Sequence, residues 1–177
     1  MEKASSGIVV DASPLIALAK MRRLEILRVL YGHVWIGPGV KEEVVDQGQA
    51  IAARGVELIE KALQEGWIQV VRLSTRERKL AQRITKASRL DAGETESLVL
   101  AQSRKRRVIV DDREARATAA AMGLELIGTA GVLLEGFFRG HLTREHLEDA
   151  VRELSRTIWL SPAVVAEILQ RAREVRK

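Results

Sequence analysis

The sequence predicts an α/β fold of three layers, with a central parallel sheet of about five short strands flanked by helices. Short apolar runs alternate with segments of helical periodicity, which is the pattern of a parallel sheet with crossover helices. The runs at residues 7–11 and 108–110 are indicative of buried strands. The 177 residues, 46% of them hydrophobic, suffice for one domain with a sizeable core.

The elements follow in order along the chain. Strands are expected at residues 7–11, 34–36, 67–73, 108–110 and 124–127. Helices are expected from 14 onward and at 24–30, from 38 onward, and at 52–64, 76–87, 91–103, 113–122, 128–138, 145–155 and 162–175. Ser13 and Pro14 predict a helix start with a hydroxyl N-cap and proline at the first helical position. Asp91 followed by Glu94 predicts a second start with a capping box.

The domain is expected to cover residues 1–140, with residues 141–177 forming a C-terminal helical extension packed on it. Apolar side chains of this extension predict core packing, and alternatively a homodimer or partner-binding face. They are Trp159, Leu160, Val164, Val165, Ile168 and Leu169.

Composition limits the chemistry. The chain has no cysteine, which excludes disulfides, thiol catalysis and cysteine-ligated zinc, and its three histidines are not spaced as a zinc pair. Lys plus Arg number 29 against 24 Asp plus Glu, and the net charge of +5 favours a polyanionic partner. Aromatic residues are scarce, so base stacking is not expected. Neither a signal peptide nor an apolar run of about 18 residues is apparent, so we expect a cytoplasmic protein without a membrane span.

Acids stand at the ends of two predicted strands. Asp11 follows the first strand, and Asp111 with Asp112 follows the strand at 108–110. In open parallel sheets, ligands bind beyond the carboxyl ends of the strands, so both positions are candidates for a site. The alternative is that each acid caps the next helix, which aspartate does well.

Two more acids lie on predicted helices. Glu94 shares a buried stripe with Leu98 and Ala101, whereas Glu96 lies on the opposite face. On the helix from residue 38, Glu43 lies about 60° from the buried Val40, and Glu42 lies farther round at about 160°. Glu94 and Glu43 are therefore the inward-facing acids, with capping and plain solvation as their alternative roles.

Four carboxylates on one surface repel one another unless a cation neutralises them. Oxygen ligands favour Mg²⁺ or Mn²⁺, and such an ion activates a bound water and polarises a phosphoryl oxygen. These arguments do not choose between a phosphodiester and another phosphoryl substrate.

Four segments resemble the PIN-domain nucleases, and within them the branch similar to the VapC toxins. They are residues 9–16, 37–44, 90–101 and 110–116, and Gly128-Thr129 with residues 131–133 also fits. The resemblance implies a PIN-like fold and an endoribonuclease that cleaves single-stranded RNA with Mg²⁺ or Mn²⁺. It also implies the toxin of a toxin–antitoxin pair, with RNA, a small antitoxin and a second copy of the chain as partners.

The resemblance assigns catalytic roles to Asp11, Glu43, Glu94 and Asp112. Asp11, Glu94, Asp112 and Asp111 would bind the metal, with Ser13 and Asp91 in support. Many relatives have asparagine at the position of Asp111 and aspartate at that of Glu94, so the sequence does not say which aspartate of 111 and 112 is nearer the metal.

Three cations, Lys86, Arg89 and Arg113, could steer RNA toward the acids, whereas the run 104–107 more simply solvates a helix C-terminus. A non-catalytic relative that binds RNA or a partner protein is the alternative function. A phosphatase of another α/β fold is a third reading, but Ser13 occupies the place of the second aspartate that a haloacid-dehalogenase site needs.

Overall fold

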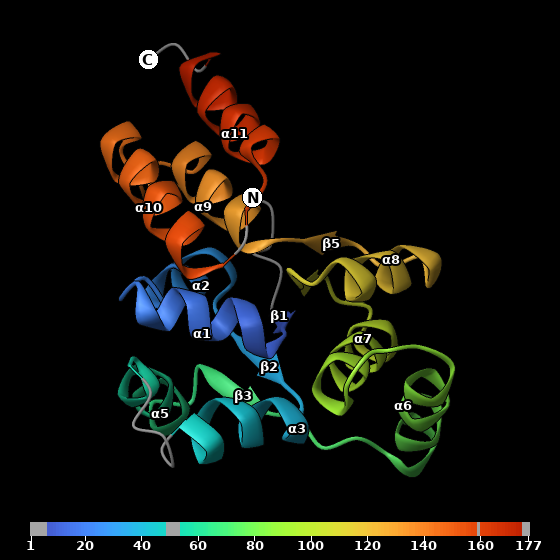
Figure 1. Ribbon diagram of the computed structural model, residues 1–177. Helices are drawn as coiled ribbons and strands as arrows, with labels where there is room; N and C mark the ends of the chain where they lie inside the picture. Colours follow the sequence, from blue (N-terminus) through green and yellow to red (C-terminus); the bar gives the residue numbers. More distant parts are fainter. Residues whose placement is uncertain (1–6, 49–53, 159, 175–177) are drawn as a thin grey trace.

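The computed structural model describes residues 7–48, 54–158 and 160–174. Five parallel strands form one sheet in the order β3-β2-β1-β4-β5 (Figure 1). Their bounds are β1 Ile8–Val10, β2 Val34–Ile36, β3 Ile68–Val70, β4 Val108–Ile109 and β5 Leu126–Ile127. The predicted parallel α/β sheet of about five short strands is thus confirmed.

Helices connect the strands and continue beyond the last one. They are α1 Ala12–Lys20, α2 Glu25–Tyr31, α3 Pro38–Lys41, the π-helix η1 Glu42–Gln47, α5 Val56–Gln64, α6 Thr75–Ala87, α7 Ala92–Arg104, α8 Arg113–Ala121, α9 Thr129–Phe138, α10 Arg144–Thr157 and α11 Pro162–Glu174.

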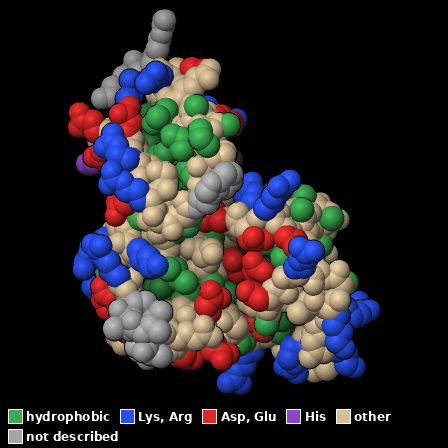
Figure 2. Space-filling model, in the orientation of Figure 1, with side chains coloured by type: hydrophobic (Ala, Val, Ile, Leu, Met, Phe, Trp, Pro, Cys, Tyr) green, Lys and Arg blue, Asp and Glu red, His purple; other side chains and the backbone are tan. Residues whose placement is uncertain are grey.

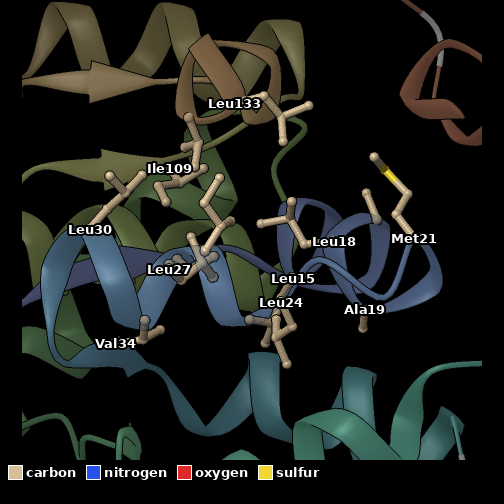
Figure 3. Packing of buried hydrophobic residues seen from close by; sticks show 14 of the residues in the cluster. Leu15, Leu18, Ala19, Met21, Leu24, Leu27, Leu30, Val34, Ile109 and Leu133 are labelled. Carbon is tan, nitrogen blue, oxygen red and sulfur yellow. The ribbon is translucent and has the colours of Figure 1, made fainter. Parts of the chain in front are cut away.

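The sheet is the middle of three layers because successive strand side chains enter different cores. In β1, Ile8 and Val10 belong to a core shared with α1, α2, α9 and α10, whereas Val9 belongs to a second core shared with α6, α7 and α8. Figure 3 shows the first core, where leucines of α1 and α2 meet Ile109 of β4 and Leu133 of α9. Burial on both faces explains why the sequences of the central strands β1 and β4 are continuously apolar, whereas the edge strand β3 contains Gln69 and is exposed beyond Ile68.

The strand order places a topological switch point beside β1. From β1 the chain adds β2 and then β3 on one side, and it later returns to add β4 and β5 on the other side. The carboxyl ends of β1 and β4 are adjacent, since the Asp11 N–H donates to the Ile109 carbonyl at 3.1 Å. Ligands of open α/β sheets bind at such a point, so the sheet brings Asp11 and the 111–112 pair to one functional edge.

The predicted start of the first helix is wrong. α1 begins at Ala12 with Asp11 at the N-cap position, and Ser13 is an exposed residue of the first turn. Pro14 is buried in that same turn, where a missing N–H costs nothing because no earlier carbonyl is available to it. Strand β1 therefore passes directly into α1, and the hydroxyl cap that we expected from Ser13 does not form.

Other elements are shorter than predicted. β3 ends at Val70 and β5 begins at Leu126, because only these residues pair with the neighbouring strand. The helix expected at 52–64 begins at Val56, after Gly55 at φ 93°, and residues 52 and 53 lie outside the described part of the chain. The helix from Pro38 widens after Lys41 into η1, a departure that the 3.6-residue period does not anticipate.

The C-terminal helices pack onto the first core. Leu147 and Leu154 of α10 and Ile168 of α11 are buried there beside α9. Val164 is exposed, and Trp159 lies outside the described residues. Across the part of the chain that the structure describes, every helix is too short or too polar to span a membrane.

Candidate functional site

Asp11 is the most deeply buried acid of the candidate site. Its residue is 3% exposed at the carboxyl end of β1, and its side chain makes no capping hydrogen bond to α1. Burial, followed by the negative charges of Glu94 and Asp91, raises its pKa to about 7, although the nearby Ala12 N–H and Ser97 hydroxyl act in the opposite direction. Burial of the Asp11 carboxyl thus outweighs the two donors beside it, and a pKa raised in this way is common among functional acids.

Ser97 is a residue of this site that the sequence analysis did not identify. It is fully buried on α7, and its hydroxyl lies 3.2 Å from Oδ1 of Asp11 and 2.9 Å from the Gly93 carbonyl oxygen. Ser13, the expected source of a supporting hydroxyl, is exposed on α1. The sequence did contain a signal for Ser97. Its hydroxyl is expected beside Leu98 on the buried side of the predicted helix, about one turn after Glu94.

Glu94 lies in the first turn of α7 and is half-buried, whereas the adjacent buried face carries Leu98 and Ala101. The predicted capping box is confirmed: the Asp91 side chain accepts from the Glu94 N–H at 2.9 Å, and Glu94 Oε2 accepts from the Asp91 N–H at 2.9 Å. Burial and the charges of Asp91, Asp112 and Glu43 raise the pKa of Glu94, against the lowering effect of the Asp91 N–H. Its capping role leaves Oε1 as the oxygen that could face a ligand.

Glu43 belongs to η1 and is half-buried, whereas its neighbour Glu42 is exposed. The face predicted for these two acids is therefore confirmed. Burial and the charge of Asp91 raise the pKa of Glu43, so this acid belongs to the same electrostatic group as Glu94. Glu96 faces elsewhere, because its Oε2 accepts from the Gly39 N–H at 2.7 Å and joins α7 to α3.

The two aspartates that follow β4 have different partners. Asp111 directs both carboxylate oxygens at Thr129, accepting from its N–H at 2.8 Å and from its hydroxyl at 2.6 Å. Asp112 caps α8 through Oδ1, which accepts from the N–H groups of Glu114 and Ala115 at 2.8 and 2.9 Å. Oδ2 of Asp112 is not used in this cap, and it is the charge of Asp112 that acts on Glu94. The geometry therefore favours Asp112 over Asp111 as the acid that faces the site.

The carboxylates form one electrostatic group with no preassembled ligand shell. Figure 2 shows Asp and Glu side chains gathered near the centre of the face drawn, where α7 and α8 approach the end of β1 in Figure 1. Within the described ranges, no three His, Cys, Asp or Glu side chains stand close enough together to hold an ion. Glu94 and Asp112 each direct one carboxylate oxygen at a helix N-terminus, which accounts for the open spacing between the acids. The donor chemistry, carboxylate oxygen throughout, fits Mg²⁺ or Mn²⁺.

Two of the three expected RNA-steering cations, Arg89 and Arg113, lie near this edge, since Arg113 directly follows Asp112 and Arg89 contacts the first turn of α8. Lys86, Arg89 and Arg113 are exposed, and the backbone N–H of Arg89 donates to Glu114 Oε1 at 2.8 Å, which fastens the loop before α7 to the first turn of α8. The run 104–107 lies at the opposite, amino-terminal end of β4. There Arg104 pairs with Glu77 at 2.6 Å, so part of this run has a structural role.

Comparison with models of protein families identifies a match over most of the chain. A family model described as a PIN domain, DUF3368, matches residues 7–174, which include every acid of the candidate site and the C-terminal helices α10 and α11. No curated protein matches the chain.

Proposed function

The chain belongs to the PIN-domain family, whose members are in general nucleases, and from that premise we propose that it is a divalent-metal-dependent endoribonuclease acting on single-stranded RNA. The observation that carries the proposal is the convergence of acids on the switch point of the sheet. Three of these acids, Asp11, Glu43 and Glu94, have raised pKa values because they are buried beside other negative charges. Such a cluster is stabilised by a cation and is poorly stable without one.

In this proposal Asp11, Glu94 and Asp112 bind the ion, and Glu43 completes the acidic edge. A bound Mg²⁺ or Mn²⁺ supplies a water of lowered pKa and a charge that polarises the scissile phosphate. The acids of the chain would bind and orient the ion. Asp11 would have to be deprotonated to hold the ion, so metal affinity should rise with pH up to its pKa of about 7. Asp112 and Glu94 each hold one oxygen on a helix N-terminus, and the other oxygen of each would be available to hold the ion.

RNA recognition would depend on the phosphate backbone. The exposed Arg113 directly follows Asp112, and Arg89 is held beside the first turn of α8. Only 3% of the residues are aromatic, so stacking platforms are few and sequence-tolerant backbone binding is favoured. The choice of RNA, and of a single strand, rests on the resemblance of the motifs to the VapC-like branch.

A substrate panel tests the proposal. The purified chain is incubated with end-labelled single-stranded RNA, duplex RNA, single-stranded DNA and p-nitrophenyl phosphate, each with Mg²⁺, Mn²⁺ or EDTA. We expect internal cleavage of single-stranded RNA that requires the metal. Faster hydrolysis of the small ester than of RNA would instead support a phosphatase, and binding of RNA without any cleavage would support a non-catalytic relative.

A non-catalytic RNA-binding or partner-binding PIN domain is the second candidate. It is favoured by the commitment of Asp111 to Thr129 and by the absence, in the residues described, of a ready-made cluster of three ligands. A toxin role is the narrower form of the main proposal. A neighbouring gene for a small DNA-binding protein that blocks cleavage when added to the chain would support that role, as would a homodimer in solution.

A further inference from the structure

The exposed face of α6 carries a cationic stripe, of which only Lys86 was expected to steer RNA. The stripe consists of Arg76, Lys79, Arg83 and Lys86, which are all exposed. These residues follow one another at steps of three, four and three, so they lie within about 80° of one another around the helix and span roughly 15 Å along it. Figure 2 shows Lys and Arg side chains on the part of the surface where Figure 1 places α6.

The opposite face of α6 packs onto the rest of the fold. Ala81 is buried there in the core shared with α7 and α8. Glu77, the one acid of α6, is also buried, and it accepts from Arg104 at 2.6 Å. Arg78 lies outside the stripe and donates to the Leu73 carbonyl at 2.8 Å. The only acid of this helix is therefore already paired, and it does not neutralise the stripe.

The four cations of the stripe differ from the exposed charges of other helices. In the part of the chain that the structure describes, their side chains form no ion pair and no hydrogen bond. On α10, by contrast, Arg152 pairs with Asp149 at 3.0 Å. On α11, Arg171 pairs with Glu167 at 2.7 Å. Mixed signs solubilise those faces, so solubility does not require a face of one sign.

A face of one sign is unfavourable for the helix itself. Neighbours along the stripe are three or four residues apart, which is the spacing at which like charges on a helix repel each other. Arg76 also lies in the first turn, where the helix dipole disfavours a cation. A polyanion bound along the stripe would relieve both effects.

One end of the cationic stripe adjoins the acidic edge. In the last turn of α6, the Thr85 hydroxyl lies 3.0 Å from the hydroxyl of Thr95, which directly follows Glu94 in α7. At the other end of α6, Glu77 meets Arg104 at the end of α7. The two helices are therefore antiparallel, and the stripe begins beside the acid-bearing turn of α7 and leads away from it along α6.

We propose that the cationic stripe binds the phosphate backbone of the RNA beside the segment that reaches the acids. The inference rests on the proposed nuclease function, because it assigns the stripe to the same RNA. Exposed cations along about 15 Å suit several successive phosphates of one strand. Helix α6 contains no aromatic residue, so the contact would be electrostatic and would not read bases. Affinity should then increase with the length of the RNA.

Equilibrium binding of a fluorescent single-stranded RNA of about 16 nucleotides, in EDTA to prevent cleavage, tests the proposal. The double variant Arg76→Gln/Arg83→Gln removes two charges of the stripe, and α6 should be retained because glutamine has a similar helix propensity. At low salt the Kd should rise roughly three- to tenfold. The slope of log Kd against log salt should fall by about 1.4, because each contact with a single strand contributes about 0.7.

Arg156→Gln/Arg173→Gln is the matched control. It removes two exposed arginines of α10 and α11, far from α6 in Figure 1, with the same change in net charge. The Kd and the salt slope of this control should match those of the parent. Equal effects in the two double variants would assign RNA binding to net charge and contradict the stripe, as would a parent chain that does not bind the RNA at low salt.

The length of the RNA and its cleavage separate this inference from the nuclease proposal. Lengthening the RNA from about 4 to about 16 nucleotides should improve the affinity of the control more than that of the stripe variant, and an equal gain would overturn the stripe. If the parent does not cut RNA with Mn²⁺ but the stripe variant binds it more weakly, the stripe is supported and the nuclease proposal fails. If the parent cuts RNA and the stripe variant binds it as the control does, the nuclease proposal is supported and the stripe fails.

Discussion

The hydroxyl of Ser97 lies 3.2 Å from Oδ1 of Asp11, and both residues are buried between β1 and α7. The same hydroxyl lies 2.9 Å from the Gly93 carbonyl oxygen. A hydroxyl has only one proton to donate, so it stabilises the Asp11 carboxylate only when it turns away from Gly93. The Asp11 carboxylate and the Gly93 carbonyl therefore compete for one hydroxyl proton.

Deleting this hydroxyl should raise the pKa of Asp11 above about 7, because the charged carboxylate loses its side-chain donor. Ser97→Ala should also weaken Mn²⁺ binding about tenfold, as is typical when the partner of a metal ligand is removed. Carboxyl ¹³C NMR gives the pKa, and electron paramagnetic resonance gives the free Mn²⁺.

Thr95→Val is the matched control for that experiment. Thr95 also places a buried hydroxyl on α7, but this group contacts Thr85 and the Asp91 carbonyl and not Asp11. The control should lose stability without a change in the pKa of Asp11. Equal effects of both variants on Mn²⁺ binding would show that Ser97 acts only through the packing of the helix.

The metal-free chain should lose stability as the pH rises. Asp11 has a pKa of about 7 in the folded chain and 3.8 as a model value, so between these values the folded state binds more protons than the unfolded state. The free energy of unfolding in EDTA should therefore fall by about 2–3 kcal/mol between pH 5 and pH 8 from this group. Urea denaturation at the two pH values measures the difference.

Asp11→Asn should remove most of that fall and stabilise the metal-free chain at pH 8, because the amide stays neutral. Asp149→Asn serves as the control, since Asp149 is an exposed acid paired with Arg152 at 3.0 Å. A pH dependence that is unchanged in Asp11→Asn would place the raised pKa elsewhere.

The adjacent aspartates after β4 should respond differently to the same substitution. Asp112→Asn should retain the stability of the chain, because asparagine caps a helix as well as aspartate does, yet it should weaken Mn²⁺ binding by about tenfold or more. Asp111→Asn should cost about 1 kcal/mol of stability through its bonds to Thr129 and leave Mn²⁺ binding nearly unchanged. The reverse pattern would make Asp111 the metal ligand.

Glu43 and Glu42 offer a second adjacent pair. Glu43→Gln removes a half-buried acid that is coupled to Glu94, so RNA cleavage should fall by at least about tenfold, as for other removed electrostatic groups of active sites. Glu42→Gln changes an exposed acid and should leave the cleavage rate within about twofold. Comparable losses in both variants would indicate that only the general negative charge of η1 matters.

Local patterns predict much of this fold. The central strands β1 and β4 are recognisable because they are buried on both faces and hence apolar throughout, and the Asp91–Glu94 capping box is complete within four consecutive residues. Helical periodicity also separates Glu43 from Glu42 and Glu94 from Glu96. All of these features depend on neighbours close in the sequence.

Features that depend on distant partners were not predictable. Ser97 meets Asp11 across 86 positions of the chain, and Asp111 finds Thr129 across 18. Adjacent aspartates have the same local pattern, so only the arrival of α9 beside β4 assigns them different roles. The predicted start of α1 was wrong because a serine followed by proline is a common helix opening, as at Ser13 and Pro14. The actual start, at Ala12, is set by the end of β1.

The cleavage of single-stranded RNA by the parent chain and by Asp11→Asn, side by side with Mn²⁺ at pH 8, tests the central claim most directly. The substituted chain should be folded and no less stable than the metal-free parent, so any loss of cleavage reports on the site. The metal-site account predicts metal-dependent cutting by the parent and a loss of at least about a hundredfold in Asp11→Asn. Equal cutting by the two proteins would contradict it.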